Sequence, residues 1–150
     1  MEHVAIMSKE DGLLRKILDG GKTIESRWSM DKRAPFKAVF LGDTVYFKEV
    51  GKPVTVHAVV DQLLFFEDLK DDKIKELLDF YGDKLGVGAG YFKNIVGKRY
   101  CTLIFLKNIK REEKPFDIDK TGFGNMAAWI TVENINQIKV EKAPSQGIKI

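Results

Sequence analysis

Short apolar segments separated by turn-forming residues most constrain what this 150-residue chain can fold into. Several of these segments alternate apolar and polar side chains, as β-strands with one buried face do. Gly42, Asp43, Gly51 and Pro53 lie in the turns between them. The expected strands cover residues 3–7, 37–40, 44–48, 54–60, 99–106 and 135–140. The pattern predicts a β-rich α+β fold built on a small antiparallel barrel.

Two amphipathic helices are expected between these strands. The first should begin at Ser8 as N-cap and end at Gly20, since glycine adopts the left-handed conformation at low cost. The second is acidic on its outer face and should end at Gly82. The apolar positions that recur at helical spacing are Leu13, Leu14, Ile17 and Leu18 in the first helix, and Ile74, Leu77, Leu78 and Tyr81 in the second.

The remaining segments carry weaker signals. Residues 85–97 are rich in glycine and are expected to form a loop that leads into a short helix. Residues 107–116 are expected to form a charged connector, and a short apolar element should surround Trp129. The tail from Glu141 onward is expected to be loose. We expect one domain over residues 1–150, because this length suits one domain and no internal repeat is present.

The composition indicates an ordinary folded protein with no bound metal or cofactor. Hydrophobic residues make up 44% of the chain and charged residues 31%. Cys101 lies in the apolar run YCTLIFL and is expected to be buried, and His3 and His57 lack partners at metal-ligand spacing. The GxGxG of residues 86–90 is not a nucleotide-binding fingerprint, since no strand precedes it.

No membrane segment or signal peptide is recognisable in the sequence. No stretch reaches the roughly 18 consecutive apolar residues that a membrane-spanning helix needs. The N-terminus lacks a basic region followed by a long apolar core. We therefore expect a cytoplasmic protein.

The distribution of charge is more informative than the net charge of +3. Residues 15–37 carry seven basic side chains against three acidic ones, and residues 93–114 carry seven against two. Residues 67–83 carry seven acidic side chains and three basic ones. If the two basic segments meet in space, the protein has one positive face and one negative face.

The segment GGKTIESRW, residues 20–28, combines charged and aromatic side chains directly after the first expected helix. In an extended chain, alternation places Glu25 and Arg27 on one side and Ile24 on the other, facing the core. Glu25 and Arg27 could then form an ion pair that orients the planar guanidinium toward a phosphate. Lys22 could contact an anionic ligand or could stabilise a helix C-terminus.

This segment resembles the G-x-K-x-x-E-x-R signature of the ASCH domain family, at Gly20, Lys22, Glu25 and Arg27. The order of the expected elements resembles that family over residues 3–107, with residues 108–150 as an extension. The resemblance implies a PUA-like mixed β-barrel flanked by short helices, with a cleft beside the motif. It also implies RNA binding, because ASCH domains are similar in fold to the RNA-binding PUA domains.

Some small bacterial ASCH proteins are amidohydrolases of acetylated cytidine, which use the motif lysine, a threonine and a later glutamate. The lysine matches Lys22 here, whereas Glu25 occupies the threonine position and Thr23 lies one residue after the lysine. Asp83 is the acidic residue near the place of the later glutamate. If the chain is an enzyme, the resemblance implies a hydrolase of modified nucleosides with Lys22 and Glu25 as catalytic residues.

Three functions follow from the sequence. The first is binding of RNA or another nucleic acid, the second is hydrolysis of an acylated nucleoside, and the third is an interaction domain for a protein or a small anion. Trp28 could stack on a base or fill the core, whereas Trp129 is expected in the core. The candidate ligand-binding residues are Lys22, Glu25, Arg27, Trp28, Lys48, Tyr91 and Arg99.

Overall fold

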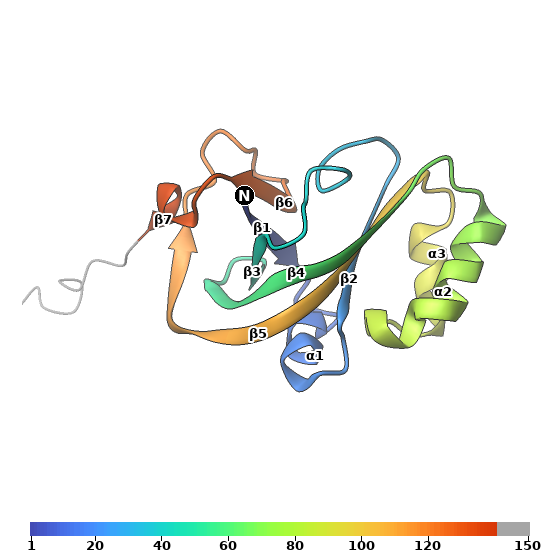
Figure 1. Ribbon diagram of the computed structural model, residues 1–150, viewed down its shortest axis with the longest axis horizontal. Coiled ribbons are helices and arrows are strands. Elements are labelled where there is room, and N and C mark those ends of the chain that lie inside the picture. The colour runs from blue at the N-terminus through green and yellow to red at the C-terminus, as the bar shows by residue number, and fades with distance from the viewer. Residues whose placement is uncertain (141–150) are drawn as a thin grey trace, which may run out of the picture.

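The computed structural model describes residues 1–140 and shows a curled, mixed β-sheet flanked by short helices (Figure 1). The strands follow the order β2-β5-β4-β3-β1-β6, and β7 pairs with the end of β5. The strands are β1 (Glu2–Met7), β2 (Ile24–Ser29), β3 (Thr44–Glu49), β4 (Val54–Phe66), β5 (Tyr100–Ile118), β6 (Trp129–Val132) and β7 (Lys139–Val140). The predicted β-rich α+β fold of PUA-like type is confirmed.

Three α-helices and two 3₁₀ turns lie within the described residues. The α-helices are α1 (Leu13–Asp19), α2 (Asp71–Leu85) and α3 (Phe92–Ile95), and the 3₁₀ turns are η1 (Ala89–Tyr91) and η2 (Ile135–Gln137). In Figure 1, α2 and α3 lie together at one end of the sheet, and α1 lies near β2. None of the helices in residues 1–140 is long and apolar enough to cross a membrane.

The antiparallel pairing expected for the strands at residues 44–48 and 54–60 is confirmed, and one parallel pair makes the sheet mixed. β4 pairs with β3 and β5 in antiparallel register, whereas β1 pairs with β3 in parallel register from Glu2 opposite Thr44 to Met7 opposite Glu49. β2 pairs antiparallel with β5 and forms one edge of the sheet. The motif strand therefore has one free edge.

Three apolar clusters fill the space around the sheet. One lies under α1 and includes Ile17 and Phe47, and a second joins β1, β6 and the far part of β5. The third joins α2 and α3 to β2 and β5, with Ile24 and Cys101 among its buried residues. The predicted core positions of Ile24, Cys101 and Trp129 are confirmed, since each is at most 9% exposed. Burial raises the pKa of the Cys101 thiol.

The predicted strand at residues 37–40 is wrong. The backbone N–H groups of Phe36 and Ala38 donate to carbonyls within the same loop, and Lys37 has a φ of 54°. Phe36 and Val39 are buried, so the apolar residues of this segment anchor a turn to the core. A short apolar run such as Ala38 to Phe40 does not distinguish a strand from a turn that is anchored to the core.

The charged connector predicted at residues 107–116 is also wrong, because β5 continues to Ile118. This part of β5 pairs with β4 through several register shifts and then with β7. Its charged side chains are mostly exposed, so the sheet supplies backbone hydrogen bonds without burying those charges. Pairing with a neighbouring strand outweighs the polar composition here.

Several helix limits also differ from the prediction. α1 begins after Gly12, and the Ser8 hydroxyl instead accepts a hydrogen bond from the Glu10 N–H. α2 continues past Gly82 because Leu85 is fully buried, and it ends at Gly86 with a φ of 73°. The end of α1 at Gly20 and the short helix in residues 85–97 are confirmed.

The C-terminal part of the described chain contains η2 and a two-residue β7 where one strand was predicted for residues 135–140. The Asn134 side chain accepts a hydrogen bond from the Asn136 N–H, and a capping box with Gln137 favours the helical turn over a strand. The expectation for the tail from residue 141 lies outside the described residues.

Candidate functional site

The motif segment lies between α1 and the C-terminal end of α2. The Lys22 N–H donates to the carbonyl of Lys16 across 3.0 Å, and the Thr23 N–H donates to the carbonyl of Lys84 across 2.9 Å. β2 then runs along β5, with Ile24 opposite Phe105 and Ser29 opposite Tyr100. The segment that leads into β2 is therefore held by α1 and α2, which are far apart from each other in the sequence.

The Lys22 side chain is buried and fully hydrogen-bonded. It is 1% exposed, and Nζ donates to the carbonyl oxygens of Ile24 and Leu85, each across 2.8 Å. The third contact of Nζ is Glu25 Oε1 at 3.1 Å. An ammonium has three N–H donors, so these contacts use all of them. Lys22 caps the C-terminus of α2, whereas the sequence placed it beside the C-terminus of α1.

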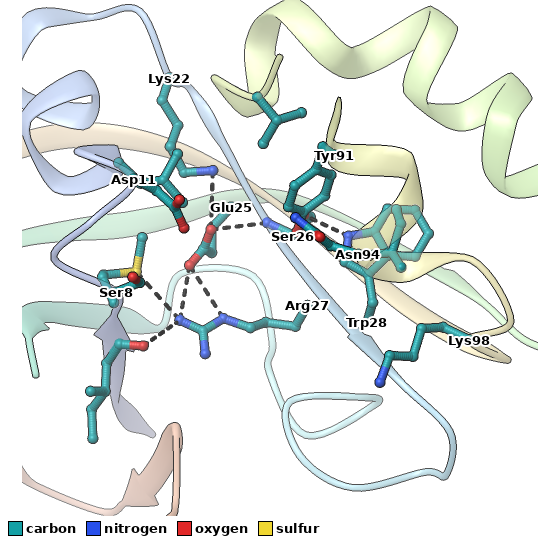
Figure 2. A pocket seen from close by; sticks show the side chains of 15 residues that line it. Ser8, Asp11, Lys22, Glu25, Ser26, Arg27, Trp28, Tyr91, Asn94 and Lys98 are labelled. Carbon is teal, nitrogen blue, oxygen red and sulfur yellow. Dashed lines mark hydrogen bonds and ion pairs between the residues drawn. The ribbon is translucent and has the colours of Figure 1, made fainter. Parts of the chain in front are cut away.

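Glu25 lies at the centre of an ion network (Figure 2). Its Oε1 contacts the Lys22 ammonium and accepts the Ser26 N–H, and its Oε2 accepts two N–H groups of Arg27 at 3.0 and 3.2 Å. Burial raises the pKa of this carboxyl, but the Lys22 and Arg27 charges outweigh it and hold the pKa below its usual value. Glu25 is a paired carboxylate.

Arg27 is held by Glu25 and by the backbone carbonyls of Ile6 in β1 and of Ala128 just before β6. Its Nη2 donates to Ile6 O at 3.3 Å, its Nη1 donates to Ala128 O at 3.0 Å, and its guanidinium lies 5.3 Å from the Trp129 ring centroid. The predicted Glu25–Arg27 pair is present. Within residues 1–140, one N–H of Nη1 has no partner, and the side chain is 18% exposed.

A cleft of about 360 Å³ opens beside this network. It is lined by β2, by residues from the end of β1 to the start of α1, and by the segment that follows α2. Figure 2 shows Lys22, Glu25 and the Arg27 guanidinium on one side, with Trp28, Tyr91 and Lys98 on the other. The lining residues are Ile6, Met7, Ser8, Asp11, Leu13, Lys22, Glu25, Ser26, Arg27, Trp28, Val87, Tyr91, Asn94, Ile95 and Lys98. The volume lies within the range of small-ligand sites, about 300–1,000 Å³.

Two aromatic side chains line this cleft. The Trp28 indole is half-buried and donates from Nε1 to the Ser26 hydroxyl across 3.0 Å, which fixes its ring. Tyr91 comes from η1, and burial raises the pKa of its hydroxyl. Five of the seven residues expected at the site therefore lie together: Lys22, Glu25, Arg27, Trp28 and Tyr91.

Lys48 and Arg99, also expected at the site, do not line this cleft. Lys48 lies on β3 opposite Ile6, and burial lowers its pKa, as does the neighbouring charge of Lys120. Arg99 donates to the carbonyl of Leu69 before α2. Lys48 lies near Lys120 and Asp117, and Arg99 is held by Leu69, so both side chains are engaged outside the cleft.

Lys98 is the basic cleft residue that the sequence analysis missed. It follows α3, and within residues 1–140 its ammonium has no ion pair and no hydrogen-bond partner. Asp11 and Asn94 also line the cleft from exposed positions. These residues do not form a motif in the sequence, because they come from separate parts of the chain that meet beside β2 only in the folded protein. The basic composition of residues 93–114 was the signal that could have pointed to Lys98.

The described residues contain no group of three or more His, Cys, Asp and Glu side chains that could hold a metal ion. His3 is fully buried and contacts Asp43 and Trp129, and His57 contacts Glu112 on the sheet surface. Neither histidine lines the cleft.

Searches against family models and against curated proteins found no match to this sequence. Among solved structures, the ASCH protein from Zymomonas mobilis matches at 17% identity with a TM-score of 0.62, covering 91% of each chain. A serine-to-alanine variant of that protein matches at 17% identity and TM-score 0.68, covering 91% of each chain. A tyrosine-to-phenylalanine variant matches at 16% identity and TM-score 0.65, covering 91% of this chain and 93% of that one. This chain has the fold of an ASCH domain protein.

Proposed function

We propose that this chain is an ASCH-family protein that binds single-stranded RNA in the cleft beside β2. The observation that carries the proposal is the pairing, in one cleft, of two aromatic side chains with two cations that have free N–H groups. Trp28 and Tyr91 are the aromatic residues, and Arg27 and Lys98 are the cations. Aromatic side chains stack on unpaired bases, and cations contact phosphates.

The charges of the cleft favour an anionic ligand. Lys22, Arg27 and Lys98 line it together with Asp11 and Glu25. Glu25 is neutralised by Lys22 and Arg27, which it contacts directly, so its charge is not available to repel a phosphate. Lys98 then supplies a positive charge that no described residue pairs.

The basic segments also meet in space at this site. β2 belongs to the first basic segment and pairs in antiparallel register with the start of β5, which belongs to the second. Lys98 precedes β5 and lines the same cleft as Arg27. This arrangement favours the nucleic-acid hypothesis over an interaction domain whose basic segments lie on opposite faces.

Hydrolysis of an acylated nucleoside has less support. A general base needs a free lone pair, and the Lys22 ammonium is held by three acceptors in a buried position. Glu25 has its pKa lowered, which disfavours it as a proton donor. Ser8 and Ser26 line the cleft, but the Ser26 hydroxyl accepts a hydrogen bond from the Trp28 indole, and no described histidine lies beside either serine.

The test is binding of fluorescent hexauridylate and of a duplex RNA, followed by anisotropy over a salt series. We expect the single strand to bind more tightly and its affinity to fall as salt rises, because binding releases counterions. Lys98→Ala should weaken binding and reduce the slope of log affinity against log salt by about one. Lys93→Ala is the matched control, since this exposed lysine of α3 lies outside the cleft.

Circular dichroism and thermal melting establish that both variants fold as the parent protein does. Equal loss of binding in the two lysine variants would place the RNA outside this cleft. No binding of either RNA at low salt would refute the proposal, and turnover of acetylated cytidine by the parent protein would then favour the hydrolase.

A further inference from the structure

We propose that the site takes two consecutive nucleotides of a single strand together with one flanking phosphate. This inference rests on the proposed function and specifies its ligand. Three observations support it: other cavities adjoin the cleft, neighbouring cavities share lining residues, and the charged side chains differ from one cavity to the next.

The cleft beside β2, which we call the central cleft, adjoins a second cavity of about 260 Å³. This second cavity, called the Lys16 cavity, is lined by Lys16, Asp11 and the glycines Gly86, Gly88 and Gly90, among others. The two share Asp11, Leu13, Val87, Tyr91 and Asn94 as lining residues. Tyr91 therefore lines both cavities. An aromatic side chain that lines two adjoining cavities suits one base in each of them.

A third cavity adjoins the opposite end of the central cleft. This Arg33 cavity measures about 90 Å³ and shares Arg27 and Trp28 with the central cleft. It is the smallest of these three cavities, so it suits a phosphate group better than a base. Arg33 pairs with Asp31 through Nε and Nη2 at an exposed position, and its other guanidinium N–H groups remain for a phosphate.

The charge balance becomes negative beyond the Lys16 cavity, where Lys16 and Asp11 offset each other. The next cavity, called the acidic cavity, shares only Val87 and Gly88 with it and is lined by Asp79, Asp83 and Lys75. Lys75 lies 3.6 Å from Asp79, which leaves Asp83 as an unpaired negative charge among the described residues. A phosphate is repelled there, so the bound strand leaves the groove at Gly88.

Lys16 is the cation of the second cavity. Its Nζ donates to the carbonyl of Gly86 across 2.7 Å, and two of its N–H groups remain for a ligand. The contact with Gly86 holds the ammonium at the cavity wall. This position suits the phosphate that links the first nucleotide to the second.

The experiment measures competition against labelled hexauridylate by UMP, UpU, pUpU, UpUp and UpUpU. We expect UpU to bind about fivefold to a hundredfold more tightly than UMP, as one added stacked base does. Either pUpU or UpUp should bind more tightly than UpU, and which of the two does so reports the direction of the bound strand. UpUpU should bind no more tightly than the better of these two dinucleotides. Equal affinity of UMP and UpU would overturn the inference.

Lys16→Gln removes the charge while its amide can still donate to the Gly86 carbonyl. It should weaken UpU and leave UMP unchanged, and Arg15→Gln is the matched control because Arg15 lines none of these cavities. Asp83→Asn should raise the affinity for UpUpU and not for UpU. Equal weakening of UMP and UpU by Lys16→Gln would overturn the two-nucleotide site. Absence of binding by every RNA would instead refute the proposed function itself.

Discussion

The Lys22 ammonium donates to the carbonyl oxygen of Leu85 across 2.8 Å and so caps the C-terminus of α2. This contact joins the start of β2 to the last residue of α2, which lies 63 positions later in the sequence. Helix C-termini favour cations, and a buried ammonium needs all its donors satisfied. Lys22 therefore has a structural role at the cleft, and among the described residues that line it, Arg27 and Lys98 are the cations with free N–H groups.

Replacement of Lys22 by methionine should destabilise the fold. It leaves the Glu25 carboxylate with Arg27 as its remaining charge partner and leaves the Leu85 carbonyl without its donor, and breaking a buried pair costs about 3–5 kcal/mol. Urea denaturation measures this loss. Arg15→Ala, which breaks an exposed pair with Asp19, should change stability by less than about 1 kcal/mol. Unchanged stability of Lys22→Met would contradict the structural role.

Substitution of Gly86 by alanine should also destabilise the protein. Gly86 has a φ of 73°, and an added Cβ would lie 3.1 Å from Lys22 Cβ. The left-handed conformation alone costs alanine roughly 1–2 kcal/mol. Gly82→Ala is the control, since it lies inside α2 with open space around it and should be stabilising by about 0.4–1 kcal/mol. The two melting temperatures should shift in opposite directions, and a shared shift would argue against this account.

Stability should fall as the pH drops below 6.5 because of His3. Burial lowers the pKa of His3 below its usual 6.5, although the hydrogen bond to Asp43 opposes this shift. The Trp129 N–H points at Nδ1, so a proton there would meet another donor. The unfolded chain then binds a proton more readily than the folded chain, and lowering the pH favours unfolding.

The measurement is the free energy of unfolding in urea between pH 8 and pH 5, values chosen to bracket the ordinary histidine pKa of about 6.5. His3→Gln keeps a donor for Asp43 and should remove the step near pH 6.5. An identical pH profile for the parent and His3→Gln would show that another group titrates in this range.

Trp28 should contribute to RNA binding through its ring. Trp28→Ala should weaken hexauridylate binding by about 1–3 kcal/mol, the usual value for one stacked base, and Trp28→Phe should recover part of it. Phe80→Ala is the control because Phe80 is 77% exposed on α2 and lines none of the cavities described above. Equal affinities for the three proteins would indicate that Trp28 only supports the core.

The sequence was sufficient for those features that depend on neighbouring residues. Alternation and turn residues predicted the β-rich α+β fold and the strands at residues 3–7 and 44–48, and glycine predicted the end of α1 at Gly20. The spacing of Glu25 and Arg27 predicted their ion pair, because residues two apart in a strand share a face. The buried positions of Ile24 and Cys101 followed from their apolar surroundings.

The tertiary structure decided the features that depend on distant neighbours. β5 extends through the charged residues 107–116 because β4 and β7 supply backbone partners, and α2 passes Gly82 because Leu85 has a core to enter. The role of Lys22 depends on the end of α2, and Lys98 reaches the cleft only because α3 folds against β2 and β5. Local composition identifies most of the strands and helices, but packing sets how far β5 and α2 extend and which groups a buried charge contacts.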